Sequence, residues 1–218
     1  MKRKYSYIGL SLIILVFGIW SIPKIVAYVK SNYSKPDSAY LKKELATIGK
    51  VPEFSFINQN GETITNADYK GKVYVVEFFF TSCPTICPIM NNNMVGLQNE
   101  FFGNPNFGIA AFSIDPTKDT PEVLKKYAES YGITHPNWNL LTGDREKIYS
   151  LANSGFNLYV AEAPEVPGNF EHSGYFALVD QEGNIRSRRD DFGNPIIYYN
   201  GLEKKDLQML KEDIKKLL

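Results

Sequence analysis

The sequence predicts an α/β fold, a mixed β-sheet with helices on both faces, preceded by one N-terminal transmembrane helix. Three observations lead to this prediction. A run of 19 uncharged, mostly apolar residues, 5–23, follows a basic start. Two nearly continuous runs of β-branched and aromatic residues, Val73–Phe80 and Phe107–Ile114, are typical of strands buried on both faces. Segments with helical spacing of apolar residues alternate with these strands, as in an α/β domain.

The first thirty residues differ in composition from the rest of the chain. As a helix, the apolar run reaches about 28 Å, against a hydrocarbon core of roughly 30 Å. A retained signal-anchor helix, a cleaved signal peptide and a buried core helix are the alternatives. The basic start Met1–Lys4 favours an export or membrane signal. Retention is favoured over cleavage because Lys24 and Ile25 do not suit a cleavage site at Ala27. We therefore expect residues 1–30 to be a single-pass anchor, with the globular part on the extracytoplasmic (periplasmic) side of the cell membrane.

A polar segment, residues 31–50, is predicted to be a tether that leads into one domain, residues 51–218. That domain opens with alternating residues on either side of the Asn60-Gly61 turn, which predicts a hairpin over 54–65. The run Val73–Phe80 follows as a central strand.

Helical and strand patterns then alternate to the end of the chain. Apolar spacing predicts a helix from Pro84 to Phe101, and Phe107–Ile114 reads as the second buried strand. Asp119 and Thr120 precede Pro121, and Gly132 follows Tyr131, which predicts a helix between them. The remaining predicted elements are a short helix at 144–153, a hairpin at 174–188 and an amphipathic helix at 203–218.

The composition of the chain limits its partners. The 24 Lys and Arg residues balance 24 Asp and Glu residues, and no long basic run occurs, so a nucleic-acid partner is not expected. The four methionines do not form the Met-rich tracts that supply thioether ligands to soft metals. Any soft-metal site must therefore use the two cysteines.

The two cysteines lie in the motif Cys83-Pro-Thr-Ile-Cys87-Pro88, directly after the first buried strand. The carboxyl ends of strands are where α/β folds place their reactive loops. If the helix begins at Pro84, Cys83 lies at its amino end and Cys87 one turn later, with Cβ atoms about 5 to 6 Å apart. A disulfide prefers roughly 3.5 to 4.5 Å, so this spacing suits convergence on one ion better than a relaxed bridge.

The start of that helix also predicts the chemistry of the pair. Exposed N–H groups and the helix dipole should lower the pKa of Cys83, and a thiolate is both a soft metal ligand and a nucleophile. A purely structural disulfide is the alternative. It would close only a very small loop, so it would stabilise the domain little.

The two histidines, His135 and His172, are the candidates for a third ligand. His172 precedes the strand predicted at 174–180, so its turn can reach the same sheet edge as the cysteine loop. His135 lies on a loop before a proline, and its simplest interpretation is a surface or satisfied loop histidine. Two cysteines and one histidine form a soft set that favours Cu(I), whereas structural zinc would require a fourth protein ligand.

Two further groups of charged residues border these segments. Asp115 and Asp119 flank the loop after the second buried strand, where turn and helix-capping roles are expected. The arginines 186, 188 and 189 stand beside Asp190 and Asp191 and are expected to form a solvated edge.

Four segments together resemble the Sco/SenC family, in the order in which that family has them. The resemblance covers most of the chain from Val51 onward. The segments are Phe78–Met90 with the cysteine motif, Phe112–Tyr127 with Ser-Ile-Asp-Pro, Leu140–Gly143, and Glu171-His172-Ser173-Gly174 before the strand that ends at Asp180.

This resemblance implies a thioredoxin-like fold, an amino-terminal membrane anchor, and copper, as Cu(I) or Cu(II), held by Cys83, Cys87 and His172. It also implies a metallochaperone that assists assembly of the dinuclear copper centre of cytochrome c oxidase, by copper delivery, by reduction of that centre's cysteines, or by both. The expected partners are the copper-bearing subunit of the oxidase and other copper carriers. The stretches 163–168 and 190–199 depart from the family pattern, and these departures are expected to affect the choice of partner and not the metal site.

A membrane-anchored thiol-disulfide oxidoreductase is the alternative function. In that case Cys83 attacks a disulfide and Cys87 resolves the intermediate. The usual spacing of such enzymes is CxxC, whereas three residues separate the cysteines here. The sequence therefore favours a metallochaperone over an enzyme.

Overall fold

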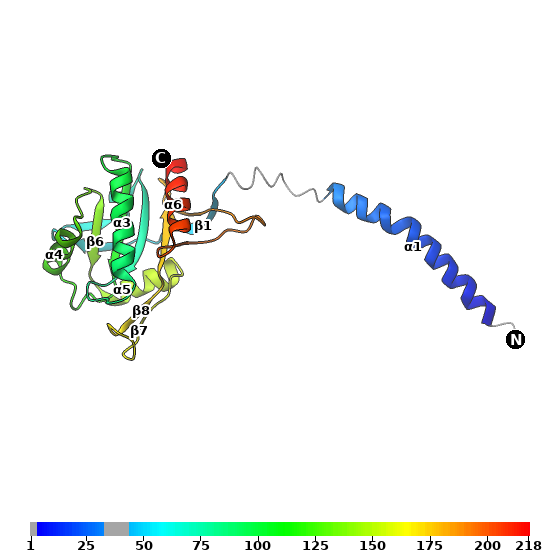
Figure 1. Ribbon diagram of the computed structural model, residues 1–218, viewed down its shortest axis with the longest axis horizontal. Helices are drawn as coiled ribbons and strands as arrows, with labels where there is room; N and C mark the ends of the chain where they lie inside the picture. Colours follow the sequence, from blue (N-terminus) through cyan, green and yellow to red (C-terminus); the bar gives the residue numbers. More distant parts are fainter. Residues whose placement is uncertain (1–3, 33–43) are drawn as a thin grey trace. The chain divides into compact units, whose positions relative to one another are not determined.

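The computed structural model describes residues 4–32 and 44–218 as two separate units (Figure 1). The first unit contains helix α1 (Lys4–Asn32). Its stretch Gly9–Tyr28 has a mean hydropathy of 2.1 and is long and apolar enough to cross a membrane. The large apolar side chains of this stretch are exposed, as those of a lipid-facing helix are. Residues 33–43 of the predicted tether lie outside the described residues.

The end of the predicted tether belongs to the domain, which corrects that prediction. Residues 46–50 form strand β1 (Ala46–Lys50), which pairs antiparallel with β10 (Asn184–Ser187) at one edge of the sheet. Leu45 and Ala46 are buried, whereas the following residues of β1 are mostly exposed. Because an edge strand has solvent beside it, its composition resembles that of a polar linker.

The domain contains a nine-stranded mixed sheet within residues 44–218. Its order is β1-β10-β9-β4-β5-β6-β2-β3, and β11 also pairs with β9. Strands β4, β5 and β6 are parallel, and β9 lies antiparallel on β4. The bounds of the remaining strands of this sheet are β2 Ser55–Asn58, β3 Thr63–Thr65, β4 Val73–Phe79, β5 Phe107–Ser113, β6 Trp138–Thr142, β9 Tyr175–Val179 and β11 Tyr199–Asn200. All seven residues of β4 and of β5 are buried, as their composition predicted.

Helices cover both faces of this sheet, which confirms the predicted fold class. On one face, the ring of Phe79 packs 5.6 Å from that of Tyr127 in α4 (Pro121–Tyr131). On the other face, Phe78 packs 6.0 Å from Phe156, which ends the α5–η2 segment. Helices α3 and α6 run side by side along the sheet (Figure 1). The bounds of the remaining helices are η1 Asn66–Tyr69, α3 Cys87–Phe101, α5 Arg145–Ser150, η2 Leu151–Gly155 and α6 Lys204–Leu217.

A second, two-stranded sheet lies at one end of the domain (Figure 1). Strand β7 (Val160–Glu162) pairs antiparallel with β8 (Phe170–His172). The loop between them packs on the end of β4, because Gly168, at φ +94°, brings its backbone against the ring of Phe80. A Cβ atom at this position would lie only 2.8 Å from that ring. The sequence patterns did not predict this hairpin, whose three-residue strands are too short to show a period.

Candidate metal centre

The topology of the sheet brings three predicted site residues to one edge. Strand β4 ends at Phe79 and leads into the loop with Cys83, while the antiparallel β9 begins at that same edge, just after His172. The ligand atoms of Cys83, Cys87 and His172 all lie within 4.8 Å of one another, and Cys87 Sγ is 3.2 Å from His172 Nε2. All three residues are buried, and both cysteines are free. No other such group of His, Cys, Asp or Glu occurs in residues 4–32 and 44–218.

Helix α3 begins at Cys87, not at Pro84 as predicted. An α-helix from Pro84 would need the N–H of residue 88 to reach the carbonyl of residue 84, and Pro88 has no N–H. In the observed helix, Ile86 precedes the first residue and Pro88 is the second residue. A proline is tolerated in this first turn because its missing N–H has no partner there. Cys83 therefore lies in the loop before the helix, and Cys87 occupies its first turn.

The imidazole of His172 is oriented by two contacts. Its Nδ1 lies 3.2 Å from the backbone oxygen of Ser173, and its ring packs edge-on against Phe80, with 5.8 Å between ring centroids. A carbonyl oxygen can only accept, so we assign the ring proton to Nδ1. The lone pair of Nε2 then faces Cys87. A second ring nitrogen bonded to a backbone carbonyl is the usual arrangement of a metal-ligating histidine.

The two thiols have very different acidities. A hydrogen bond from the Cys87 thiol lowers the pKa of Cys83 to about 3, against the opposing effect of burial. Backbone N–H groups of Cys87 and Thr85 contribute, so the predicted direction is right although the helix starts later. The hydrogen bond to Cys83, and then burial, raises the pKa of Cys87. Of the pair, Cys83 thus holds the first negative charge and Cys87 the remaining proton.

These donors fit a soft metal ion. A cation that displaces the proton of Cys87 meets two sulfurs and one imidazole nitrogen, whose atoms all lie within 4.8 Å of one another. Thiolate and imidazole are ligands for copper and zinc. A structural zinc site is usually completed by a fourth protein ligand, and no such side chain joins the cluster in the described part of the chain.

Asp119 supports the cysteine loop, a role that the sequence analysis missed. Its carboxylate is fully buried and accepts bonds from the Thr81 backbone N–H at 3.0 Å, the Thr81 hydroxyl at 2.5 Å and the Ser113 hydroxyl at 2.5 Å. The expected capping role belongs instead to Thr120, whose side chain accepts from Val123. Asp119 therefore fixes the loop start, two residues before Cys83, to the end of β5.

Replacing Asp119 with asparagine is expected to lower the free energy of unfolding by about 1 to 3 kcal/mol, because the amide directs N–H groups at hydrogen-bond donors. Urea unfolding of the full chain in detergent measures this. The matched control is Asp144→Asn, where asparagine caps α5 as well as aspartate does. Equal stability of the two variants would contradict the supporting role of Asp119.

The other predicted residues lie elsewhere. His135 is not part of the cluster, and it is buried instead of lying on the surface. Its Nδ1 accepts a hydrogen bond from the Asn137 N–H at 3.2 Å. Asp115 has the expected turn role, accepting from the Thr117 hydroxyl at 2.7 Å.

The prediction of a solvated arginine edge was wrong for two of the three residues. Arg186 pairs with the buried carboxylate of Asp180 at 2.8 Å, and Arg188 pairs with that of Asp213 at 2.7 Å. Asp180 directly follows β9, across the turn from Arg186, whereas Asp213 lies in α6, 25 residues after Arg188, beyond the reach of local charge patterns.

Comparison with known proteins gives consistent matches to one family. A family model described as SCO1/SenC matches residues 43–205. The "SCO1 protein homolog" of Bacillus subtilis (strain 168) is 34% identical over 167 residues, which are 76% of this chain and 81% of that relative.

Two solved structures share the fold. BsSco, described as a member of the Sco family of cytochrome c oxidase assembly proteins with a disulfide switch, has a TM-score of 0.67 and 31% identity, over 80% of this chain and 97% of that one. ScoI of Bradyrhizobium japonicum with copper bound has a TM-score of 0.61 and 24% identity, over 78% of this chain and 99% of that one. At 24% identity the likeness concerns the fold.

Proposed function

The chain belongs to the SCO1/SenC family, and from this membership we propose that it is a copper-binding metallochaperone that assists assembly of the dinuclear copper centre of cytochrome c oxidase. One observation carries the proposal: two free cysteines and one histidine have their ligand atoms within 4.8 Å of one another. Copper in ScoI and the description of BsSco as an oxidase assembly protein support it. The proposed ligands are Cys83, Cys87 and His172.

The donor set suits a cargo that must be both held and released. Copper is the substrate of the site, and it replaces the proton of Cys87 while Cys83 is already a thiolate. Two thiolates give affinity for Cu(I), and the imidazole nitrogen is a donor that Cu(II) also accepts. In the neutral ring, the Ser173 carbonyl favours the tautomer with the proton on Nδ1, which leaves the Nε2 lone pair for the metal. The proposed recipient is the copper-bearing subunit of the oxidase, and other copper carriers are the proposed donors.

The proposed location of this site follows from helix α1. Its stretch Gly9–Tyr28 is compatible with a membrane anchor. We assign residues 1–30 to a retained single-pass anchor and residues 51–218, extended by β1, to the copper-binding domain on the extracytoplasmic side. Positive residues before the apolar stretch support this orientation.

A matched pair of histidine variants tests copper binding. The full chain in detergent, reduced and anaerobic, is titrated with Cu(I) against a competing chelator. His172→Gln is expected to weaken binding by more than about tenfold, because it removes a proposed ligand and not only a group that supports one. His135→Gln should leave the affinity unchanged, because His135 lies outside the cluster. Native binding no tighter than that of His172→Gln would overturn the proposed site.

A thiol-disulfide reductase activity is the second candidate, and the low pKa of Cys83 favours it. Its thiolate is the nucleophile of thiol-disulfide exchange, and the Cys87 sulfur lies within 4.8 Å for the resolving step. The disulfide switch of BsSco is consistent with this chemistry. Exchange with a small disulfide separates the two functions: a reductase does not need His172, whereas copper binding does.

A further inference from the structure

An acidic residue interrupts the apolar run of the central strand. Glu77 lies in β4, is 0% exposed, and neither of its carboxyl oxygens has a hydrogen-bond partner among the described residues. Strand alternation places its side chain on the same sheet face as that of Phe79, which packs against Tyr127 of α4. The residue in register on β5 is Ala111, whose small side chain leaves room for the carboxyl group.

Two neighbouring helices connect this face of the sheet to the metal centre. Asn91 of α3 donates from Nδ2 to the backbone oxygen of Cys87 at 3.0 Å and to the Tyr127 hydroxyl at 2.5 Å. Its Oδ1 is buried and has no partner in the described chain. The hydrogen bond to Cys83 and burial raise the pKa of Cys87, burial raises that of Tyr127, and the charge of Glu77 adds a smaller increase to both. Glu77 therefore lies within electrostatic range of Cys87, on the face opposite the Phe80–His172 contact.

Stability does not explain a carboxyl group at this position. Burial without a partner raises the pKa of Glu77 to about 8, so a neutral acid is favoured at pH 7 while the site holds no cation. An apolar side chain of similar volume would avoid the cost of desolvating the carboxyl group. Cys87 and Tyr127 are the titratable groups that interact with Glu77, and both have raised pKa values. In their protonated forms they carry no charge, so neither offers a positive partner to the carboxylate. Cu(I) in place of the Cys87 proton leaves the charge of the site unchanged, whereas Cu(II) adds one positive charge, which favours the carboxylate.

We propose that the carboxylate of Glu77 acts electrostatically on the metal centre. Its negative charge raises the affinity of the site for Cu(II) relative to its affinity for Cu(I). The inference rests on the proposed copper-binding function. Two thiolates already balance Cu(II), and a third negative charge nearby interacts more favourably with the doubly charged ion than with the singly charged one. Glu77 acts through this field and is not itself a ligand.

The test measures the two affinities separately in the full chain in detergent. Cu(I) is titrated anaerobically against a Cu(I) chelator, and Cu(II) against a Cu(II) chelator. Glu77→Gln, which keeps the shape of the side chain, should lower the ratio of Cu(II) affinity to Cu(I) affinity about tenfold. Glu77→Leu should shift the ratio in the same direction. The control Glu129→Gln removes an exposed carboxylate from α4 and should leave the ratio unchanged.

The outcomes separate this inference from the function on which it rests. Native protein that binds neither ion overturns both proposals. Native protein that binds copper, with folded Glu77 variants whose affinity ratio is unchanged or whose two affinities fall equally, overturns only the role of Glu77. A lower ratio in both variants, with Glu129→Gln unchanged, supports it.

Discussion

Replacing Cys87 with serine is expected to weaken Cu(I) binding by more than about 100-fold, beyond the effect of losing a group that only supports a ligand. Cys87 is 1% exposed, its Sγ lies 3.2 Å from His172 Nε2, and the ligand atoms of all three residues lie within 4.8 Å of one another. Serine keeps the shape but offers a hard hydroxyl that is not deprotonated at neutral pH. The remaining sulfur and nitrogen then bind the ion without the second thiolate.

A neighbouring hydroxyl provides the control for this measurement. Thr85 is exposed, and its Oγ1 lies 3.6 Å from Cys83 Sγ. Thr85→Ala should therefore change the Cu(I) affinity less than about tenfold. Competition titration against a Cu(I) chelator measures both variants. If Cys87→Ser bound Cu(I) within tenfold of the native protein, Cys87 would not be a ligand.

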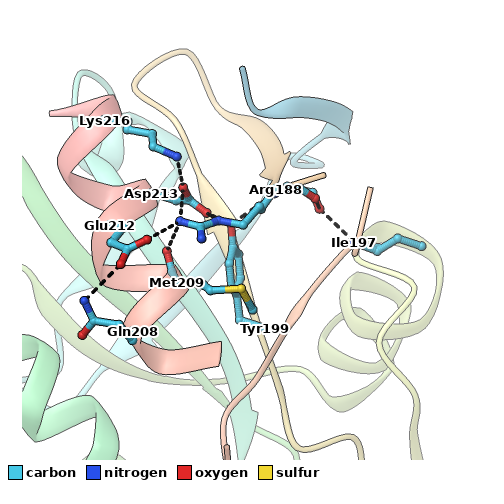
Figure 2. A network of polar contacts seen from close by, with 9 residues as sticks. Arg188, Ile197, Tyr199, Gln208, Met209, Glu212, Asp213 and Lys216 are labelled. Atoms are coloured by element: carbon cyan, nitrogen blue, oxygen red, sulfur yellow. Dashed lines mark hydrogen bonds and ion pairs between the residues drawn. The ribbon is translucent and has the colours of Figure 1, made fainter. Parts of the chain in front are cut away.

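The second large effect is expected at the ion pair between Arg188 and Asp213 (Figure 2). Asp213 is fully buried in α6, and Arg188 reaches its two oxygens at 2.7 and 2.9 Å. Tyr199 donates to the same carboxylate at 2.9 Å. Arg188→Met should lower the free energy of unfolding by about 3 to 5 kcal/mol, because it leaves a buried charge without its main partner.

A second substitution distinguishes the effect of an unpaired buried charge from the effect of lost packing. In Arg188→Met/Asp213→Leu neither charge remains, so most of the lost stability should return. The exposed pair between Lys215 and Glu100 is the control, and Lys215→Met should cost less than about 1 kcal/mol. Urea unfolding of the full chains provides the values. A double variant as unstable as Arg188→Met would show that packing, not charge, causes the loss.

The sequence predicts those elements whose side-chain composition directly reflects their burial. Strands β4 and β5 are buried on both faces, so their composition alone identifies them. Strand β1 at the sheet edge and the short hairpin β7–β8 contain both buried and exposed residues, so their composition does not identify them as strands. Helix α3 was placed three residues early because apolar spacing outweighed Pro88, whose missing N–H was the available signal.

Around the candidate site, the sequence predicted the three residues that cluster but not the residues that support them. The cysteine motif and the family resemblance pointed to Cys83, Cys87 and His172, which the structure brings together. Asp119 acts across two loops, which no local pattern reveals. Glu77 had a visible signal, since it is the one charged residue in the run Val73–Phe80. A charge inside a buried strand indicates a special environment.

The three residues of the candidate metal centre come from two separately supported segments, one of which is the small hairpin β7–β8. Cys83 and Cys87 belong to the β4–α3 connection, which the nine-stranded sheet and Asp119 hold, whereas His172 ends a strand paired only with β7. Drawing the imidazole back would separate the rings of Phe80, Phe170 and His172 without breaking one hydrogen bond of the large sheet. If copper is held by Cys83, Cys87 and His172, the histidine is therefore the donor that could withdraw with the least disturbance of the large sheet.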